Sequence, residues 1–516
     1  MSQKFTSTIA GASIFISILG LLSRGLGFIR EMIFANNFGL ETEFDLYLVG
    51  AVLPITINTV LLYIGQNFFI PEFQKINSSD TEAAQKYFKQ SFITFVAAGA
   101  FISILLFFTG DFIINIYMHS ASPARREIAT QVFNIFLLTI PFSAAVSILS
   151  ALLQTVYEFK YPAVSLLFLN ISIIVLLLFF SDRFGVYIIP AGYTLGTLLQ
   201  FGYLLLKSKK FVKLNLLNRT GGYSLSKSIL SSSIVIIILI ESISQLYSIF
   251  DRYFYGEISS GGIASLNYAM IIWFLPVSIF SISLATVVFP TITKAIIESS
   301  IDEIEKIYNE SISMNTFIFI PMAFIMFFYG DTLIRIFFER GKFVEESTAI
   351  TYGVLRFYAL SLAFYSVYAV FNKIFYSIGK AKVLLVITIT GLLLKLFLNF
   401  LLVDLQQDGL ALSTSISFIF FFFASYIVLN AKLKIKDRSL FIKDFIIHLI
   451  NCVICLISIK IVSDICRVNS LFEEVFTIGF FILLYLFNLI LIKHNALVIS
   501  NRVIKRFNLN KLFRAG

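Results

Sequence analysis

Long apolar runs and short polar breaks alternate along the whole chain. Many runs reach about 20 residues, which is enough for an α-helix to cross the ~30 Å hydrocarbon core of a bilayer. The pattern therefore predicts an all-α polytopic membrane protein with about 14 transmembrane helices. The predicted spans fall near residues 8–35, 45–70, 88–109, 129–156, 162–181, 186–206, 227–255, 262–291, 311–337, 350–377, 382–403, 408–431, 441–463 and 471–492.

Composition agrees with this pattern. Hydrophobic residues make up 58% of the 516 residues, charged residues make up only 14%, and the mean hydropathy is +0.89. Soluble domains carry roughly 25% charged residues. The net charge of +10 does not indicate nucleic-acid binding, because the cations gather in short loops and in the C-terminal tail. No nucleotide-binding loop is evident and no loop is long enough to hold a catalytic domain, so we expect a protein that is not an enzyme and has no cofactor.

Lysine and arginine predict the orientation in the membrane, because loops on the cytoplasmic side carry an excess of them. Three segments that follow an even number of spans are basic, which places both termini in the cytoplasm. These segments carry Lys207, Lys209, Lys210, Lys213 and Arg219; Lys432, Lys434, Lys436 and Arg438; and Arg502, Lys505, Arg506, Lys511 and Arg514.

A weak internal repeat runs through the sequence. Phe38-Gly39 matches Tyr255-Gly256, and Leu53-Pro54 matches Leu275-Pro276, with a spacing of about 220 residues in each case. The repeat predicts two pseudo-symmetric six-helix lobes related by an axis along the membrane normal, followed by two further helices. The predicted divisions are an N-lobe at 1–206, a basic cytoplasmic linker at 207–226, a C-lobe at 227–431, and the last two helices with a basic tail at 432–516. Chance matches in so apolar a sequence are the alternative.

Arg24 and Arg30 interrupt the first apolar run. An arginine at the centre of a spanning helix costs roughly 3 kcal/mol on insertion scales, so such residues are expected to face a protein interior or a water-filled cavity. The two are six residues apart, which separates them by ~120° around a helix and by about 9 Å along it. They suit the two ends of one extended anion, such as a diphosphate. The alternative is that Arg30 pairs locally with Glu31 or Asp45 and that one arginine extends to the interface.

Further polar groups interrupt the second half. Lys395 and Asn399 are four residues apart, so they share one face of a helix. A buried lysine needs a partner, and Asp251 is the nearest candidate in the predicted C-lobe. The pair is either a structural salt bridge or a site whose charge state drives a transport cycle.

Glycine and proline mark predicted hinges. Gly25 and Gly27 would let another helix or a ligand approach closely. Pro54 and Pro276 occupy matching places in the second and eighth spans, where proline bends a helix and leaves a carbonyl without its usual partner. Simple packing kinks are the alternative for both prolines.

The first of these motifs resembles a known family. Ser23-Arg24-x-Leu26-Gly27-Phe28-x-Arg30-Glu31, then Phe38-Gly39, Asp45 and Leu53-Pro54, is similar to the N-terminal signature of the MurJ (MviN) lipid II flippases. These belong to the multidrug/oligosaccharidyl-lipid/polysaccharide exporter superfamily. Gly341-Lys342-Phe343 and the segment from Gly409 to Ser415 add to the resemblance, which covers most of the chain.

The resemblance implies fourteen helices, two lobes and a central cationic cavity. It places Arg24, Arg30, Glu31 and Asp45 in the substrate cavity or at its gate. Family members also carry an arginine in the second span and another in the eighth, where this chain has Asn58 and Ile271. Some members bind sodium in the second lobe. Asp251, Asn399 and Ser415 resemble those sodium ligands, and the Lys395 ammonium falls where it would replace the metal.

The function that the resemblance implies is translocation of a polyprenyl-diphosphate-linked saccharide across the bacterial inner membrane, for peptidoglycan synthesis, cell-wall biogenesis and cell shape. Sodium or proton coupling would supply direction. Membrane lipids and other cell-envelope synthesis proteins are the partners it allows. Three alternatives stay open: export of an O-antigen, capsule or related polysaccharide precursor, drug/sodium antiport within the same superfamily, or a membrane scaffold that transports nothing.

Overall fold

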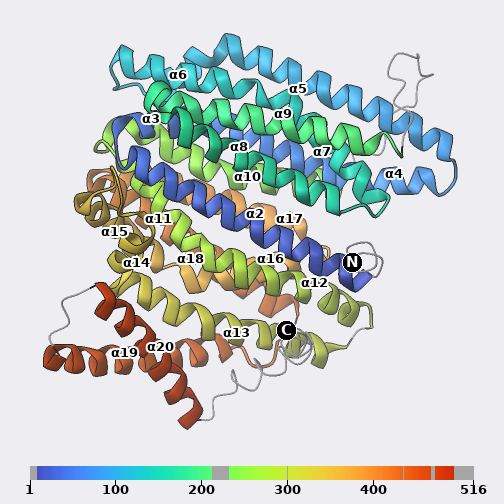
Figure 1. Cartoon of the computed structure of the whole chain (residues 1–516). Helices are drawn as coiled ribbons and strands as arrows, with labels where there is room; N and C mark the ends of the chain where they lie inside the picture. Colours follow the sequence, from blue (N-terminus) through green and yellow to red (C-terminus); the bar gives the residue numbers. More distant parts are fainter. Residues whose placement is uncertain (1–8, 212–231, 299, 434, 467–470, 493–516) are drawn as a thin grey trace. The chain divides into compact units, whose positions relative to one another are not determined.

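The computed structural model describes residues 9–211, 232–298, 300–433, 435–466 and 471–492, and all regular secondary structure in these residues is helical (Figure 1). The α-helices are α2 (Ile9–Phe38), α3 (Thr42–Ile64), α4 (Ile70–Asn77), α5 (Thr81–Tyr117), α6 (Pro123–Leu137), α7 (Thr139–Thr155), α8 (Lys160–Phe184), α9 (Ile188–Ser208), α10 (Ser232–Tyr253), α11 (Gly262–Pro276), α12 (Ile282–Ile297), α13 (Ile301–Phe328), α14 (Gly330–Phe338), α15 (Glu345–Ala359), α16 (Leu362–Ser377), α17 (Ala381–Leu402), α18 (Gln406–Lys432), α19 (Leu440–Cys466) and α20 (Leu471–Leu491). Short π- and 3₁₀-helices join some of them: η1 (Gly65–Phe69), η2 (Gly185–Tyr187), η3 (Phe254–Glu257), η4 (Val277–Ser281) and η5 (Val403–Leu405).

The prediction of an all-helical polytopic membrane protein is confirmed. Within the described residues, nine helical segments are long and apolar enough to cross a membrane, or ten if the bent pair α15–α16 counts as one span. Two of the nine, Lys160–Ser208 and Ala381–Lys432, each contain two packed helices that were predicted as separate spans. Together with α2 and α10, the helices match the 14 predicted spans one for one. The basic residues of 212–231 and of the C-terminal tail lie outside the described residues.

The helices form two compact units. The first unit comprises the residues up to Ala264 together with Arg340–Val344, and the second comprises Ser265–Glu339 and the residues from Glu345 onward. Compact units and sequence repeats are different divisions of a chain, so the predicted lobe boundaries stay a prediction.

Close helix contact in the first unit depends on small residues. A Cβ on Gly192 or Gly196 of α9 would lie 2.9 Å and 2.8 Å from the Cα atoms of Ile173 and Leu169 in α8. Two glycines four residues apart lie on one face of the helix and let the backbones approach, as is common between membrane helices. These two glycines therefore allow α8 and α9 to pack closely, and the two helices lie side by side in Figure 1.

Irregular helix segments recur at matching places in the two halves of the sequence. The π-helix η1 follows α3 and the π-helix η4 follows α11, while the 3₁₀-helices η2 and η5 precede α9 and α18. In both π-containing regions a serine hydroxyl bonds a carbonyl of another helix: Ser147 donates to Leu61 at 2.7 Å, and Ser281 donates to Ser366 at 2.6 Å. These shared local features support the predicted internal repeat.

An aromatic cluster fills the second unit. The ring of Trp273, which is 1% exposed, lies 5.1 Å from that of Tyr365 and 5.4 Å from that of Phe418. Such rings bury large apolar areas and favour offset or tilted contacts. The last two helices join this unit through polar contacts, since α20 packs on α13 and Tyr485 donates to the Phe317 carbonyl at 2.9 Å.

Candidate functional site

Arg30 lies in the first unit, where α2 packs against α8. Its side chain is 16% exposed and donates to Glu31 Oε1 at 2.5 Å and to Asn170 Oδ1 at 3.1 Å. The guanidinium carbon also lies 5.5 Å from the centre of the Tyr193 ring and 5.6 Å from that of Phe34. The predicted local pairing with Glu31 is present, and the amide and the ring add contacts across to α8 and α9.

Asn170 connects this arginine to the preceding turns of α2. Its amide donates to the Ser23 carbonyl at 3.2 Å while its oxygen accepts from Arg30. A Cβ on Gly27 would lie 3.8 Å from the same oxygen, which is ordinary contact, whereas a Cβ on Gly25 would meet nothing within 4 Å of the described residues. The Asn170 side chain of α8 therefore comes close to Gly27, whereas the space beside Gly25 is open among the described residues. Both glycines lie within one continuous helix.

Arg24 is exposed, in contrast to Arg30. Both residues lie in the single helix α2, so the predicted separation of ~120° around the helix holds. One arginine is therefore held among protein groups, and the other is accessible about two turns away.

Asp45 is fully buried, and its contacts differ from those of the arginines. Its carboxylate accepts from the backbone amides of Gly261 at 2.6 Å and Ala264 at 2.7 Å, at the first turn of α11. Unpaired amides at a helix N-terminus favour a negative charge. Arg252 and Arg125 add positive charge near the carboxylate. In this structure Asp45 therefore ties the start of α11 to α3.

Loops next to Asp45 form a cluster, which we name the loop cluster and define as residues 36–45, 260–264 and 340–344. The Lys342 amide donates to the Asn36 carbonyl, and its ammonium pairs with Glu41, each at 2.9 Å. Gly39 and Gly341 both have positive φ, and a Cβ on either would lie 2.3 Å from a backbone oxygen of the facing loop. Only glycine fits such a crossing without strain, so the Gly341-Lys342-Phe343 motif has a structural role here.

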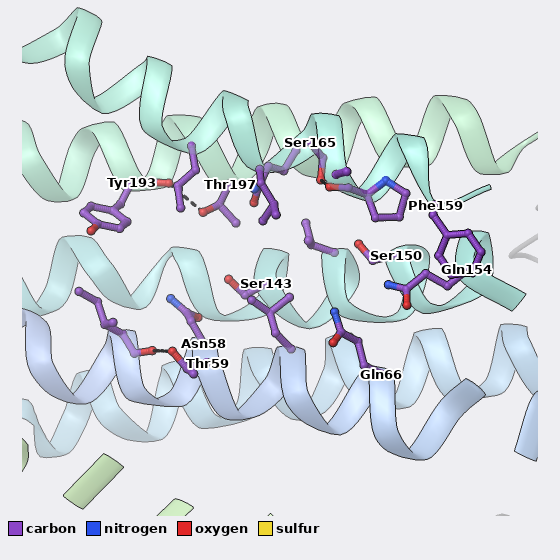
Figure 2. A pocket seen from close by; sticks show the side chains of 18 residues that line it. Asn58, Thr59, Gln66, Ser143, Ser150, Gln154, Phe159, Ser165, Tyr193 and Thr197 are labelled. Atoms are coloured by element: carbon purple, nitrogen blue, oxygen red, sulfur yellow. Dashed lines mark hydrogen bonds between the residues drawn. The ribbon is translucent and has the colours of Figure 1, made fainter. Parts of the chain in front are cut away.

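A cavity of about 410 Å³ lies between α3, α7, α8 and α9 of the first unit. Its walls include Asn58, Tyr193 and a set of further uncharged polar side chains: Thr59, Gln66, Ser143, Ser150, Gln154, Ser165, Thr197 and Gln200. Figure 2 shows Tyr193 at one end of this cavity and Phe159 with Gln154 at the other, with the remaining polar groups between them. Among the described residues, no lysine, arginine, aspartate or glutamate lines it.

The polar groups of this cavity fall into two classes. Thr197, Ser165 and Thr59 donate back to carbonyls of their own helices at 2.8–2.9 Å. Within the described part of the chain, the side chains of Ser143, Ser150, Gln154 and Gln200 have no protein partner. Asn58 donates to Thr139 at 2.7 Å, but its oxygen is buried without a partner. Among these wall groups the Asn58 oxygen is fully buried and unpaired, and the others face the cavity, so the wall suits a polar ligand or water.

Sequence reasoning found only Asn58 among these wall residues. A signal was nevertheless present, because the polar positions follow the helical period. Ser143, Ser147, Ser150 and Gln154 recur at spacings of four, three and four in apolar α7, and Tyr193, Thr197 and Gln200 do the same in α9. Such a stripe marks one polar face of a helix. Asn170 also lay in an apolar run and could have been noticed for the same reason.

The predicted polar groups of the second half are not among the described residues that line this cavity. Lys395 is fully buried and donates to Thr414 Oγ1 at 2.6 Å, which joins α17 to α18. Asn399, on the same face of α17, accepts from Ser413. Asp251 is buried in the first unit and Lys395 belongs to the second, so the ion pair predicted between them stays a prediction.

The residues predicted as sodium ligands have other partners. Ser415 donates to the Phe357 carbonyl at 2.7 Å, and its oxygen lies 3.2 Å from that of Ser361. The Lys395 ammonium lies one helical turn from Asn399, so a second cation beside Asn399 would be repelled. The described groups around Asn399 therefore suit the ammonium of Lys395 better than a sodium ion.

These features define a class of protein. The helices are long and apolar, and they expose many large apolar side chains such as Phe108. Polar groups gather around a cavity in the first unit. That combination is typical of a multi-pass membrane transporter. Residues 34–487 match the family described as "Lipid II flippase MurJ", and the chain belongs to this family. It is accordingly a transporter of a family involved in peptidoglycan synthesis rather than an enzyme, as the sequence predicted.

Individual relatives support this family assignment. A protein from Buchnera aphidicola, described as "Probable lipid II flippase MurJ", is 28% identical over 466 residues, which cover 87% of this chain and 88% of that protein. A solved structure titled "Lipid II flippase MurJ, inward closed conformation" has a TM-score of 0.78 at 24% identity and covers 96% of this chain and 99% of that one. A MATE-family multidrug transporter in an inward-facing conformation has a TM-score of 0.65 at 16% identity, with 80% and 94% covered. The last two likenesses concern the fold.

Proposed function

We propose that this protein translocates a polyprenyl-diphosphate-linked saccharide, lipid II or a related cell-envelope precursor, across the bacterial cytoplasmic membrane by alternating access. The observation that carries the proposal is Arg30, a mostly buried cation held by Glu31, Asn170 and Tyr193 at the end of an uncharged polar cavity. Family membership supports the class of substrate.

The chemistry of the substrate fits this arrangement. A diphosphate is a strong acceptor with two separated anionic groups, and arginine is the side chain best suited to bind it. Arg24 is exposed, so it can meet the anion first, and Arg30 lies about 9 Å further along the same helix. Glu31 keeps Arg30 from being an unpaired charge while no anion is bound.

The loop cluster is the element we assign to closure on one side. Its contacts are backbone hydrogen bonds, the Asp45 carboxylate on the first turn of α11, and the ion pair of Glu41 with Lys342. Each is individually modest, at about 1–3 kcal/mol for a charged hydrogen bond and less for an exposed ion pair. Such contacts can break and reform within a transport cycle.

Lys395 and Asp251 are the groups we assign to coupling. The basic segments after the even-numbered predicted spans support a cytoplasmic location of both termini. The substrate would be taken up from this cytoplasmic face. Arg24, Arg30, Glu31 and Asn58 are the substrate-side groups.

Asn58 favours a second candidate within the same class. It occupies a cavity wall where the sequence resemblance places an arginine, so the cavity is less cationic than that of a typical family member. A related lipid-linked saccharide, such as a capsule or O-antigen precursor, would need less positive charge there.

Depletion of the protein in its host tests the proposal. We expect one lipid-linked saccharide to accumulate on the inner leaflet, detected by its inaccessibility to an external enzyme that cuts the sugar from the lipid. The identity of that saccharide distinguishes lipid II from the second candidate. If no lipid-linked saccharide accumulates while cell-wall synthesis proceeds normally, the proposal is wrong.

A further inference from the structure

The cavity of the first unit has a composition that selects for one kind of ligand. It offers hydroxyl and amide groups from several helices, and none of the described residues that line it is ionised. A phosphate placed there would lose its hydration without gaining a cation, which is strongly unfavourable. A purely apolar chain would leave the wall groups unpaired. The lining therefore does not suit the diphosphate, and its mixture of polar groups with apolar side chains such as Leu62, Val146 and Leu169 suits a ligand that has both hydroxyl groups and C–H faces.

The unpaired groups show what the cavity can bind. Ser143, Ser150 and Gln200 are each 6% exposed, and none has a protein hydrogen-bond partner in the described chain. Hydroxyls and side-chain amides both donate and accept. Sugar hydroxyls and acetamido groups have the same dual character, so each wall group can find a partner on a glycan.

Size and position agree with this chemistry. A volume of about 410 Å³ lies within the range of roughly 300–1,000 Å³ that is usual for small-molecule sites. Tyr193 contacts the guanidinium of Arg30 with its ring and also lines the cavity. A group bound at Arg30 and a group bound in the cavity would therefore be neighbours, as a diphosphate and its attached sugar are.

We propose that this cavity is a subsite for the uncharged glycosyl part of the substrate, with Gln200, Ser150 and Asn58 as specificity-determining residues. The inference rests on the proposed function, because it takes the sugar to be part of a lipid-linked diphosphate. Charge recognition is thereby assigned to α2, and sugar recognition to α3, α7 and α9.

The test uses the purified full chain and two lipids that differ only in the sugar: undecaprenyl diphosphate and the same lipid carrying a neutral disaccharide. The double variant Gln200→Leu/Ser150→Ala removes donors and acceptors that have no protein partner, so its melting temperature should match that of the wild type. We expect it to bind the glycosylated lipid about tenfold or more weakly, because each lost hydrogen bond is worth about 1 kcal/mol. Its binding of undecaprenyl diphosphate should change by less than about twofold.

Two controls keep the result specific. Gln131→Leu changes an exposed glutamine of α6 outside the cavity and should bind both lipids like the wild type. Ser150→Ala alone is the milder variant, and if the double variant unfolds, its selective loss for the glycosylated lipid decides. Equal losses for both lipids, or no loss for either, would overturn the proposal.

The free disaccharide separates this inference from the proposed function. If the wild type binds neither lipid but binds the disaccharide, and Gln200→Leu abolishes that binding, the sugar subsite stands and the flippase proposal fails. If the wild type translocates the glycosylated lipid and the cavity variants translocate it equally well, the flippase proposal stands and the sugar subsite fails. Absence of binding to all three compounds contradicts both.

Discussion

Arg30 and Tyr193 meet with the guanidinium carbon 5.5 Å from the ring centre. The same ring borders the polar cavity, so a charged group on α2 and a neutral site between four helical segments share one side chain. A cation–π contact of this kind is worth about 0.5–2 kcal/mol, more where water is excluded. Tyr193 thus connects Arg30 to the wall of the cavity, although nothing in the local sequence of either residue indicates the other.

Arg24 is expected to be required for transport but not for folding. It is exposed in α2, so Arg24→Ala should leave the melting temperature within about 1–2 °C of the wild type. Loss of a charged contact to the diphosphate should lower transport about tenfold or more. Complementation of a depleted strain and a flipping assay measure this directly. Arg24→Lys is the matched control, with an intermediate rate expected because lysine lacks the paired donors.

Arg30 is expected to affect both stability and transport, and the two effects can be separated. Arg30→Gln leaves Glu31 without its ion pair and should destabilise the protein, towards the lower end of the about 3–5 kcal/mol seen when buried pairs are broken. The double variant Arg30→Gln/Glu31→Gln removes both charges and should regain most of that stability. Transport should remain low in the double variant. If transport recovers along with stability, Arg30 has only a structural role.

Asp45 is expected to stabilise the first turn of α11. Asp45→Ala removes the acceptor of two amide hydrogen bonds from a buried site and should cost about 2–4 kcal/mol. Asp45→Asn keeps the shape and one of the two acceptor oxygens, so one backbone amide loses its partner and only part of the stability should remain. Thermal unfolding in detergent compares the variants. Equal melting temperatures for Asp45→Ala and the wild type would contradict the capping role.

Sodium is not expected to accelerate transport, because Lys395 already places a positive charge in the polar cluster of the second unit. The rate with sodium chloride should match the rate with potassium or choline chloride. A stimulation of the wild type by sodium of about fivefold or more, the size of a typical coupling, would show that Lys395 does not replace a cation.

The sequence predicted the fold well because membrane helices leave a strong and local signal. The length of each apolar run, about 20 residues, follows from the thickness of the bilayer alone. The 14 predicted spans accordingly match described helices. The exact ends were less accurate. Thr81–Tyr117 extends well beyond the predicted 88–109, because its first two turns are polar and Gly110-Asp111 interrupts the apolar run near its other end. The break between Ala359 and Leu362, with its 53° bend, was also not visible in the pattern.

The candidate site was only partly predictable, for a different physical reason. Arg30 and Glu31 are neighbours in sequence, so their pairing could be anticipated from the motif. Asn170 and Tyr193 reach Arg30 only through the packing of α8 and α9 on α2, which no local pattern shows. The buried contact of Asp45 with Gly261 depends in the same way on chain folding over 216 residues.

The proposed function requires that this protein move a lipid-linked saccharide by means of the α2 arginines. The most direct test is reconstitution of the purified chain in liposomes that carry a labelled polyprenyl-diphosphate saccharide, with its exposure to an external quencher followed over time. We expect time-dependent transfer by the wild type, a rate lowered about tenfold or more in Arg24→Ala, and a wild-type rate in Gln131→Leu. No transfer by the wild type above protein-free liposomes, or equal rates in the wild type and Arg24→Ala, would contradict it.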